Sequence, residues 1–404
     1  MAAPKRKIIN DPVYGFITIN HPLIFSILAH PYYQRLRRIT QMAMGQLVYP
    51  GAVHTRFHHS LGAYHLMGNA VNELRSKGTE ITEEEEIAVK AAILLHDIGH
   101  GPYSHALEHV VVKGVHHEAL SLQIMHEMND AFDGQLTLAI QIFTGAYHKP
   151  FLHQLISGQL DVDRMDYLSR DSFFCGVSEG VIGYDRILKM LVVVDGQLMI
   201  EEKGIYSVEK FLVARRQMYW QVYLHKTVLS AEKMMVKILE RARSLYTSTD
   251  GAMLTGSALD YFLGTFNGSM DPYALAQFCA LDDHDIMHAI KRWSSHPDKV
   301  LSLLCSRFLT RKLYKTTIQS EPFLPDTIAA KQKESLEAFA LDPSEVDYVC
   351  FTGVATNTLY QTKDERINIL FKDGSIKDIS LIDNALIHQN LSAAVKKNYI
   401  CQLL

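Results

Sequence analysis

The sequence predicts a mainly α-helical protein with short β-hairpins and a small α+β lobe at its C-terminus. Between about residues 21 and 315, apolar residues recur every three or four positions, as on the buried face of a helix. Beyond about residue 320 the pattern changes to a charged helix and short strands. With 404 residues, 48% of them hydrophobic, the chain can bury one large core and a smaller one. We expect a helical domain over residues 1–320 and the lobe over residues 321–404.

Local signals support the elements of the large domain in chain order. An apolar run at residues 16–19 predicts a strand. A helix begins after Thr82, which forms a capping box with Glu85, and it ends in the Gly-rich motif HDIGHGP. Residues 192–200 predict a β-hairpin around an Asp-Gly turn.

The lobe begins with a charged helix at residues 329–339. Two segments, VDYVCFTGV (346–354) and INILFKDGSIKDI (367–379), then predict strands, and the second contains an Asp-Gly turn. This succession indicates an α+β arrangement.

Composition and charge exclude several classes of function. The net charge of −4 gives no basic field for nucleic acid, so the sequence carries no strong nucleic-acid signal. No stretch approaches 18 consecutive apolar residues, and no apolar segment follows the basic start, so we expect no membrane span and a cytoplasmic location. The five cysteines form no C-x-x-C motif, which argues against a disulfide framework or cysteine-ligated zinc.

Histidines gather in one part of the chain. Of the 20 histidines, thirteen lie between His54 and His153. An even spread would place about five there, so the excess marks a candidate site.

Within this window, two imidazoles and two carboxylates have positions suited to metal ligation. His96 and Asp97 follow a buried-looking helix, and His59 shares the inward face of the helix before it. Asp163 begins a polar stripe that continues through Tyr167 and Asp171. An isolated buried His is more often a hydrogen-bonded core residue, and a lone Asp is more often a cap or a surface group. Together they predict a mixed nitrogen and oxygen site for Mn, Fe, Co, Ni, Zn or Mg.

The order H…HD…D resembles the signature of the HD-domain phosphohydrolase superfamily. The motifs QRLRRITQ, LVYPGAVHTRFHHSLG, LLHDIGHGPYSHALE, HHEALS, DVDRMDYLSRD and YLHK are most similar to its deoxynucleoside triphosphate (dNTP) triphosphohydrolase branch. That branch includes the sterile-alpha-motif/HD enzymes and bacterial relatives. The resemblance covers about residues 7–245 and implies an HD-domain helical core with its metal site within residues 54–171.

The resemblance implies hydrolysis of a dNTP at the α-phosphorus, which releases a deoxynucleoside and triphosphate. A bound divalent ion would lower the pKa of its water and neutralise phosphate charge. The implied metal ligands are His59, His96, Asp97 and Asp163. The implied catalytic residues are His100, His105 and His117, with Glu108 orienting His105. His100 and His105 could instead cap the Gly-rich turn, and the adjacent His116 is an alternative to His117.

The implied substrate contacts comprise cations for the phosphates and polar groups for the sugar and base. They are Gln41, Arg56, Arg164, Tyr167, Asp171, Arg215 and Tyr223. Gln41, Tyr167 and Asp171 would bind the sugar, and a tyrosine ring against C2′ would disfavour ribonucleotides. In the family, the positions of Arg215 and Tyr223 contact phosphate and base. At the position of Arg164 the family usually has Lys, which changes the geometry of phosphate contacts.

The resemblance also implies a homo-oligomer and a possible nucleotide activator site. Lys7 and Arg37 match positions that bind activator phosphates, whereas Ala29 occupies the position at which the animal enzyme reads guanine with an Asp. We therefore expect either no guanine-specific activation or a different selectivity.

Two other functions remain as alternatives. One is an HD-type phosphatase or phosphodiesterase acting on nucleoside monophosphates or cyclic nucleotides, because the metal ligands are common to all of these enzymes. The other is a nucleotide-sensing binding protein in which the HD metal site is structural. The additional Arg56, Arg164 and Arg215 favour a polyphosphate substrate.

Overall fold

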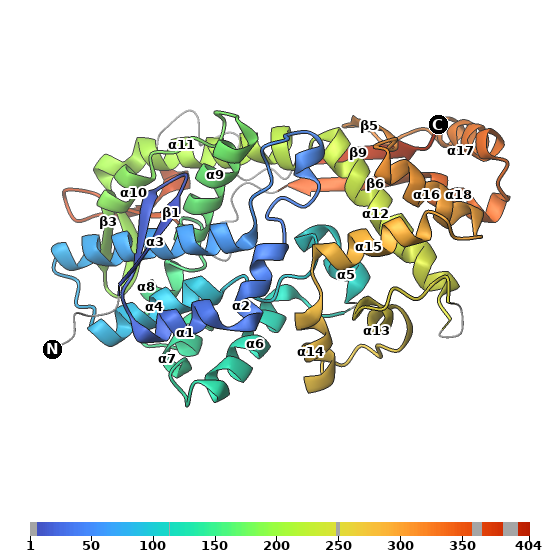
Figure 1. Cartoon of the computed structure of the whole chain (residues 1–404). Helices are drawn as coiled ribbons and strands as arrows, with labels where there is room; N and C mark the ends of the chain where they lie inside the picture. The colour runs from blue at the N-terminus through green and yellow to red at the C-terminus, as the bar shows by residue number, and fades with distance from the viewer. Residues whose placement is uncertain (1–5, 113, 248–250, 358–365, 383–394) are drawn as a thin grey trace.

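Helices dominate the structure, as the sequence predicts. The computed structural model describes residues 6–112, 114–247, 251–357, 366–382 and 395–404 (Figure 1). The helices of the first half are α1 (Pro22–Ala29), α2 (Pro31–Arg35), α3 (Arg56–Ser76), α4 (Glu83–Leu95), α5 (Glu108–Val111), α6 (His117–Ala131), α7 (Thr137–Phe143), α8 (Pro150–Gln154), α9 (Val162–Cys175) and α10 (Tyr184–Met190). The second half contains α11 (Ile205–Met218), α12 (Lys226–Leu245), α13 (Leu259–Gly264), α14 (Pro272–Ala280), α15 (Asp283–Trp293), α16 (Lys299–Leu309), α17 (Pro325–Phe339) and α18 (Val346–Val349).

Helices α3, α4 and α9 form the centre of the predicted HD core. Helix α3 packs against both α4 and α9 (Figure 1). The capping box of Thr82 and Glu85 is present at the start of α4, and the apolar run of this helix is buried. Gly62 allows α3 and α9 to approach closely, because a Cβ atom there would lie 1.9 Å from a carboxylate oxygen of Asp166. This contact brings side chains of α9 next to His59.

The strands form three small sheets. They are β1 (Lys7–Asp11), β2 (Gly15–Ile19), β3 (Leu191–Val194), β4 (Gln197–Glu201), β5 (Lys315–Gln319), β6 (Cys350–Asn357), β7 (Asn368–Leu370), β8 (Ile376–Asp378) and β9 (Val395–Gln402). The predicted hairpin β3–β4 is confirmed, and both Asp195 and Gly196 at its turn have positive φ. The predicted strand at residues 16–19 is also confirmed, as β2 paired with β1.

Two sheets combine strands from both sides of residue 320. Strand β7 pairs in parallel with β4, and β5 pairs with β9 in a sheet of order β5-β9-β6. The predicted charged helix is α17, which lies over the strands at one end of the molecule (Figure 1). The division into domains at residue 320 remains a prediction.

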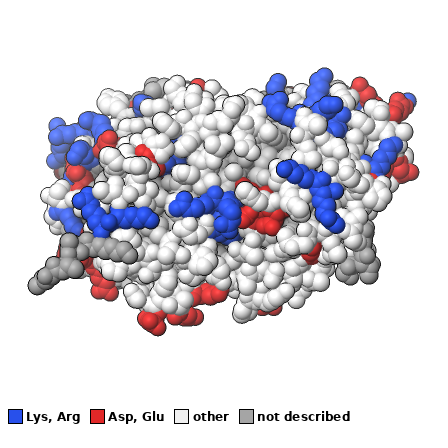
Figure 2. All heavy atoms as spheres, in the orientation of Figure 1, with Lys and Arg blue, Asp and Glu red and all other residues white. Residues whose placement is uncertain are grey.

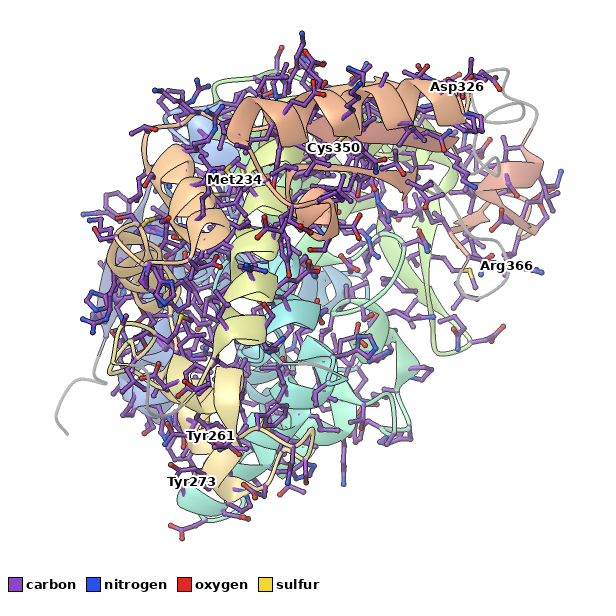
Figure 3. The ribbon with its side chains drawn as sticks, turned by 90° about the vertical axis from the view of Figure 1, so that its right-hand side faces the viewer. Met234, Tyr261, Tyr273, Asp326, Cys350 and Arg366 are labelled. Atoms are coloured by element: carbon purple, nitrogen blue, oxygen red, sulfur yellow. The ribbon has the colours of Figure 1, made fainter. Side chains whose placement is uncertain are left out.

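Helix α12 connects the core to the C-terminal strands. It packs against α16 and β5, and also against two short 3-10 turns, η2 (Gly45–Leu47) and η3 (Ser104–Ala106). In Figure 3, α12, on which Met234 is labelled, runs from the region of Cys350 toward the helices that carry Tyr261 and Tyr273.

The surface view is consistent with the charge balance of the sequence. Figure 2 shows Lys and Arg in separate groups interspersed with Asp and Glu on the face in view. Among the described residues, no helix is both long and apolar enough to span a bilayer. All five cysteines are free thiols.

Candidate active site

The four predicted metal ligands converge on one point from α3, the end of α4 and α9. The Nε2 atom of His59 lies 2.9 Å from Oδ1 of Asp163, 3.4 Å from Nε2 of His96 and 3.6 Å from Oδ2 of Asp97. The Nε2 atom of His96 lies 3.4 Å from a carboxylate oxygen of both Asp97 and Asp163. Donor atoms separated by about 3 to 3.5 Å suit one ion with bonds of about 2.1 Å. These residues therefore fit a divalent metal.

Other groups fix the orientation of both imidazole rings. The Nδ1 atom of His59 lies 2.7 Å from Oδ2 of Asp166, and that of His96 lies 2.6 Å from the carbonyl oxygen of Ile93. An acceptor at Nδ1 keeps the proton there and leaves the Nε2 lone pair for a metal.

Asp166 belongs to a buried ionic network. Arg170 donates to Asp166 from Nε at 2.9 Å and from Nη2 at 3.0 Å, and its Nη1 donates to Asp11 at 2.8 Å. Asp166 and Arg170 are both fully buried. The network links strand β1 to the helix that carries Asp163.

The electrostatics of the ligand cluster favour positive charge. Burial lowers the pKa of His59, but hydrogen bonds with Asp163 and Asp166 outweigh it and raise the pKa to about 10. Burial raises the pKa of Asp163, but contacts with His59 and His96 hold it well below its usual range. The ionised carboxylates thus favour positive charge on the imidazoles. A metal cation bound at the same point would supply that charge in place of the protons.

The three predicted catalytic histidines form a second cluster beside the ligands. The rings of His100 and His117 stack with centroids 4.1 Å apart, and His105 meets both edge-on. Gly99 permits this arrangement, because a Cβ atom there would lie 2.2 Å from the carbonyl oxygen of His117. The Nε2 atom of His100 lies 3.4 Å from Oδ1 of Asp97, which connects the two clusters.

Glu108 joins two of these histidines. Its Oε1 lies 2.7 Å from Nδ1 of His117, and its Oε2 lies 3.1 Å from Nδ1 of His105. Burial raises the pKa of Glu108, but hydrogen bonds from both histidines outweigh it and hold the pKa below the usual range. The adjacent His116 lies 3.9 Å from Glu108 and is 74% exposed, so the structure places His117 rather than His116 in the cluster.

The Gly-rich turn is held by residues that the sequence did not reveal. Arg35 donates from Nη2 to the carbonyl oxygens of Ile98 and His100, at 2.8 and 3.0 Å. Asp283 accepts a hydrogen bond of 2.7 Å from the backbone N–H of Tyr103, which has a φ of 52°. A non-glycine residue at positive φ is strained, so these contacts stabilise the turn in the form that presents His100 and His105.

One cavity of about 520 Å³ joins both clusters. The predicted site residues that line it are Gln41, Arg56, Asp97, His100, His105, His117, Asp163, Tyr167, Asp171, Arg215 and Tyr223. His59 and His96 do not line the cavity themselves, but their side chains contact Asp163, which does line it. Arg56 is held against Asp97, and its Nε donates to Ser104 at 2.8 Å, so its charge is fixed at the cavity wall.

The wall predicted to bind the sugar is a network of polar side chains. Asp171 accepts a hydrogen bond of 2.7 Å from the hydroxyl of Tyr223, and its other oxygen lies 2.7 Å from Nε2 of His54. The Oε1 atom of Gln41 is buried without a hydrogen-bond partner in the described part of the chain. Tyr223 closes a π-helical segment, η5 (Tyr219–Tyr223), and such segments recur at functional sites.

Four other positions singled out in the sequence lie outside this lining. Arg164 is engaged by Asp161 and by the carbonyl oxygen of Gly158, so a phosphate in the cavity would have to compete for it. Lys7 is exposed on β1, Ala29 is exposed at the end of α1, and the exposed Arg37 lies over the ring of Phe57 at 3.6 Å.

Comparisons with known proteins show the family of this chain. A family model described as "HD domain" matches residues 56–171, and one described as "HD associated region" matches residues 182–260. The uncharacterised protein YwfO of Bacillus subtilis is 32% identical in a match that covers 93% of this chain and 87% of that protein. The chain belongs to the HD-domain phosphohydrolase superfamily.

Two further relatives of this HD phosphohydrolase have informative names. The crystal structure of a phosphohydrolase from Bacteroides thetaiotaomicron is 48% identical, with a TM-score of 0.91, and the match covers 98% of this chain and 100% of that one. Bovine deoxynucleoside triphosphate triphosphohydrolase SAMHD1 is 28% identical in a match that covers 98% of this chain and 72% of that protein. HD domains bind divalent metals, and this HD phosphohydrolase is accordingly a metal-dependent enzyme.

Proposed function

We propose that the protein hydrolyses dNTPs to a deoxynucleoside and inorganic triphosphate. The observation that carries the proposal is the single cavity that contains metal-site carboxylates, a histidine cluster and the cations Arg56 and Arg215. A triphosphate carries several negative charges and needs such cations. The similarity to bovine dNTP triphosphohydrolase SAMHD1 supports the same substrate class.

In the proposed reaction, the oxygen of water bonds to the α-phosphorus and the bond from that phosphorus to O5′ breaks. The departing O5′ receives a proton, which yields a neutral deoxynucleoside. A divalent ion held by His59, His96, Asp97 and Asp163 would supply Lewis acidity and neutralise phosphate charge.

The protein's own groups position the substrate and move the proton. Arg56, fixed by Asp97 and Ser104, presents a charge that does not need to reorganise on binding. Glu108 is hydrogen-bonded to the Nδ1 atoms of His105 and His117. Their Nε2 atoms are therefore the ones that can donate a proton to O5′.

The sugar wall suggests discrimination against ribonucleotides. Tyr167 lines the cavity beside Asp171, whose two oxygens are already engaged by Tyr223 and His54. The bulky ring of Tyr167 against C2′ would leave no room for a 2′-hydroxyl. We expect dGTP to be hydrolysed clearly faster than GTP, and equal turnover of the two would contradict this assignment.

The test is an analysis of products with each dNTP, alone and in mixtures, in the presence of Mn²⁺ and of Mg²⁺. The proposal predicts deoxynucleoside and triphosphate in equal amounts, lost in Asp163→Ala and retained in the surface control Glu240→Gln. Hydrolysis restricted to monophosphates or cyclic nucleotides would favour the phosphatase or phosphodiesterase alternative. Nucleotide binding without hydrolysis would favour a sensing protein.

A homo-oligomer and an activator site with Lys7 and Arg37 are secondary proposals. The mixtures in the same assay test activation, since one nucleotide would then accelerate the hydrolysis of another. Sedimentation with and without nucleotide tests the oligomer.

A further inference from the structure

One charged side chain in the cavity has no role in the proposed hydrolysis. Glu232 lines the cavity from α12, one helical turn after Val228, which also lines it. In the described part of the chain it forms no hydrogen bond and no ion pair. A carboxylate that faces a cavity without a protein partner is available to a ligand.

The remaining lining residues indicate which part of a nucleotide Glu232 would meet. When the residues already assigned to metal, proton transfer, phosphates and sugar are set aside, together with Tyr223, whose position contacts the base in the family, the others are Met42, Ala43, Gly45, Ser104, Ala106, Tyr219, Val222, Val228 and Glu232. Most of these are apolar, and Glu232 is the one charged residue among them. Apolar walls with one convergent polar group suit a flat base with a polar edge.

The residues that follow Gln41 in the chain support this location of the base. Gln41, proposed to bind the sugar, is followed directly by Met42 and Ala43. The next turn, η2, packs against α12, the helix that carries Glu232. The lining next to Gln41 in the chain therefore lies close to Val228 and Glu232 of α12, and we place the base attached to C1′ against this part of the cavity.

We infer that Glu232 determines base specificity by accepting hydrogen bonds from the amino-bearing edge of the base. This inference rests on the proposed function. Guanine offers adjacent N1–H and N2–H₂ donors, one for each carboxylate oxygen, whereas adenine and cytosine offer one amino group. Thymine presents a carbonyl oxygen on either side of a single N–H, and the carboxylate would repel these oxygens. The expected order is dGTP first, dATP and dCTP next, and dTTP last.

The burial of Glu232 makes its ionisation depend on which base is bound. Burial raises the pKa of this carboxyl to about 7. A bound base that donates hydrogen bonds stabilises the ionised form, whereas a carbonyl oxygen does not.

The experiment measures kcat/KM for each of the four dNTPs with the intact protein and three variants. Glu232→Gln keeps the side-chain volume but replaces one acceptor with a donor, and Glu232→Ala removes the group. Glu240→Gln, on the exposed face of the same helix, is the matched control. We expect the ratio of dGTP to dTTP to fall about 10- to 100-fold in Glu232→Gln and to fall in Glu232→Ala as well. The control should retain the native ratio.

Two results would overturn the inference, and they differ from each other. If the native protein releases triphosphate but both Glu232 variants keep its base preference, base reading by Glu232 is wrong and the proposed function stands. If no dNTP yields triphosphate, the proposed function fails and the inference fails with it. Thermal unfolding of each variant separates a change of preference from a loss of folded protein.

Discussion

The substitution Asp166→Asn should weaken metal binding without removing any metal ligand. Asp166 lies 2.7 Å from Nδ1 of His59 and is fully buried, so its charge acts on the ring at short range. Asn keeps an oxygen that can accept the Nδ1 proton, but it removes the negative charge that makes the ring a stronger donor. Loss of such an outer partner typically costs about 10- to 100-fold in metal affinity, or about 1.4 to 2.7 kcal/mol.

The same substitution has a separate effect on folding. Arg170 would lose one of its two carboxylate partners but keep Asp11 at 2.8 Å. We expect the free energy of unfolding of the metal-free protein to fall by about 1 to 3 kcal/mol, less than for a buried charge left without any partner. This loss does not depend on the metal, so the two effects can be measured separately.

The assay is a titration of metal-free protein with Mn²⁺ against a competing chelator, accompanied by urea unfolding without metal. Glu240→Gln serves as the control for an exposed carboxylate outside the site. A variant Asp166→Asn that binds Mn²⁺ as tightly as the native protein would refute the role of Asp166 in tuning His59.

Three further predictions concern other carboxylates. In Glu108→Gln, kcat should fall about 100-fold with little change in KM, because one of the two oxygens that face His105 and His117 becomes an NH₂ group, which cannot accept. An unchanged pH profile of kcat would count against this role. In Asp283→Ala, kcat should fall about 100-fold as the turn at Tyr103 relaxes, and partial rescue by Asp283→Asn would distinguish positioning from general loss of fold. Glu232 has a folded pKa of about 7 against an ordinary value of 4.5, so the folded state binds more protons than the unfolded state between these values. The contribution of Glu232 to the free energy of unfolding should therefore decrease by about 3 kcal/mol as the pH rises from 4.5 to 7. Urea titrations at several pH values should show this as a difference in slope between the native protein and Glu232→Gln, and equal slopes would contradict it.

The sequence could single out the four candidate ligands that converge in the structure because its signals for them are local. His59 and Asp163 lie on the regular helices α3 and α9, where helical periodicity indicates an inward face, and His96 follows directly at the end of the buried helix α4. The pairing of Asp166 with Arg170 carries a weaker local signal, since these opposite charges stand four residues apart beside Asp163. That spacing could have revealed the network, but it is also common on solvent-exposed helices.

The sequence carries no comparable local signal for contacts between distant segments. Asp283 is 180 residues from the Tyr103 backbone that it holds. The parallel pairing of β7 with β4 joins segments that show only short apolar runs in the sequence. Glu232 stands on an amphipathic helix, where a charged residue ordinarily indicates the solvent side. Tertiary packing places it in the cavity instead.

Hydrolysis of dGTP in ¹⁸O-labelled water tests the central claim most directly, because the position of the label reports which bond breaks. Attack of water at the α-phosphorus predicts one ¹⁸O atom in the released triphosphate and none in the deoxyguanosine, with no product in Asp163→Ala. Label in the deoxyguanosine, or release of phosphate or pyrophosphate in place of triphosphate, would contradict it.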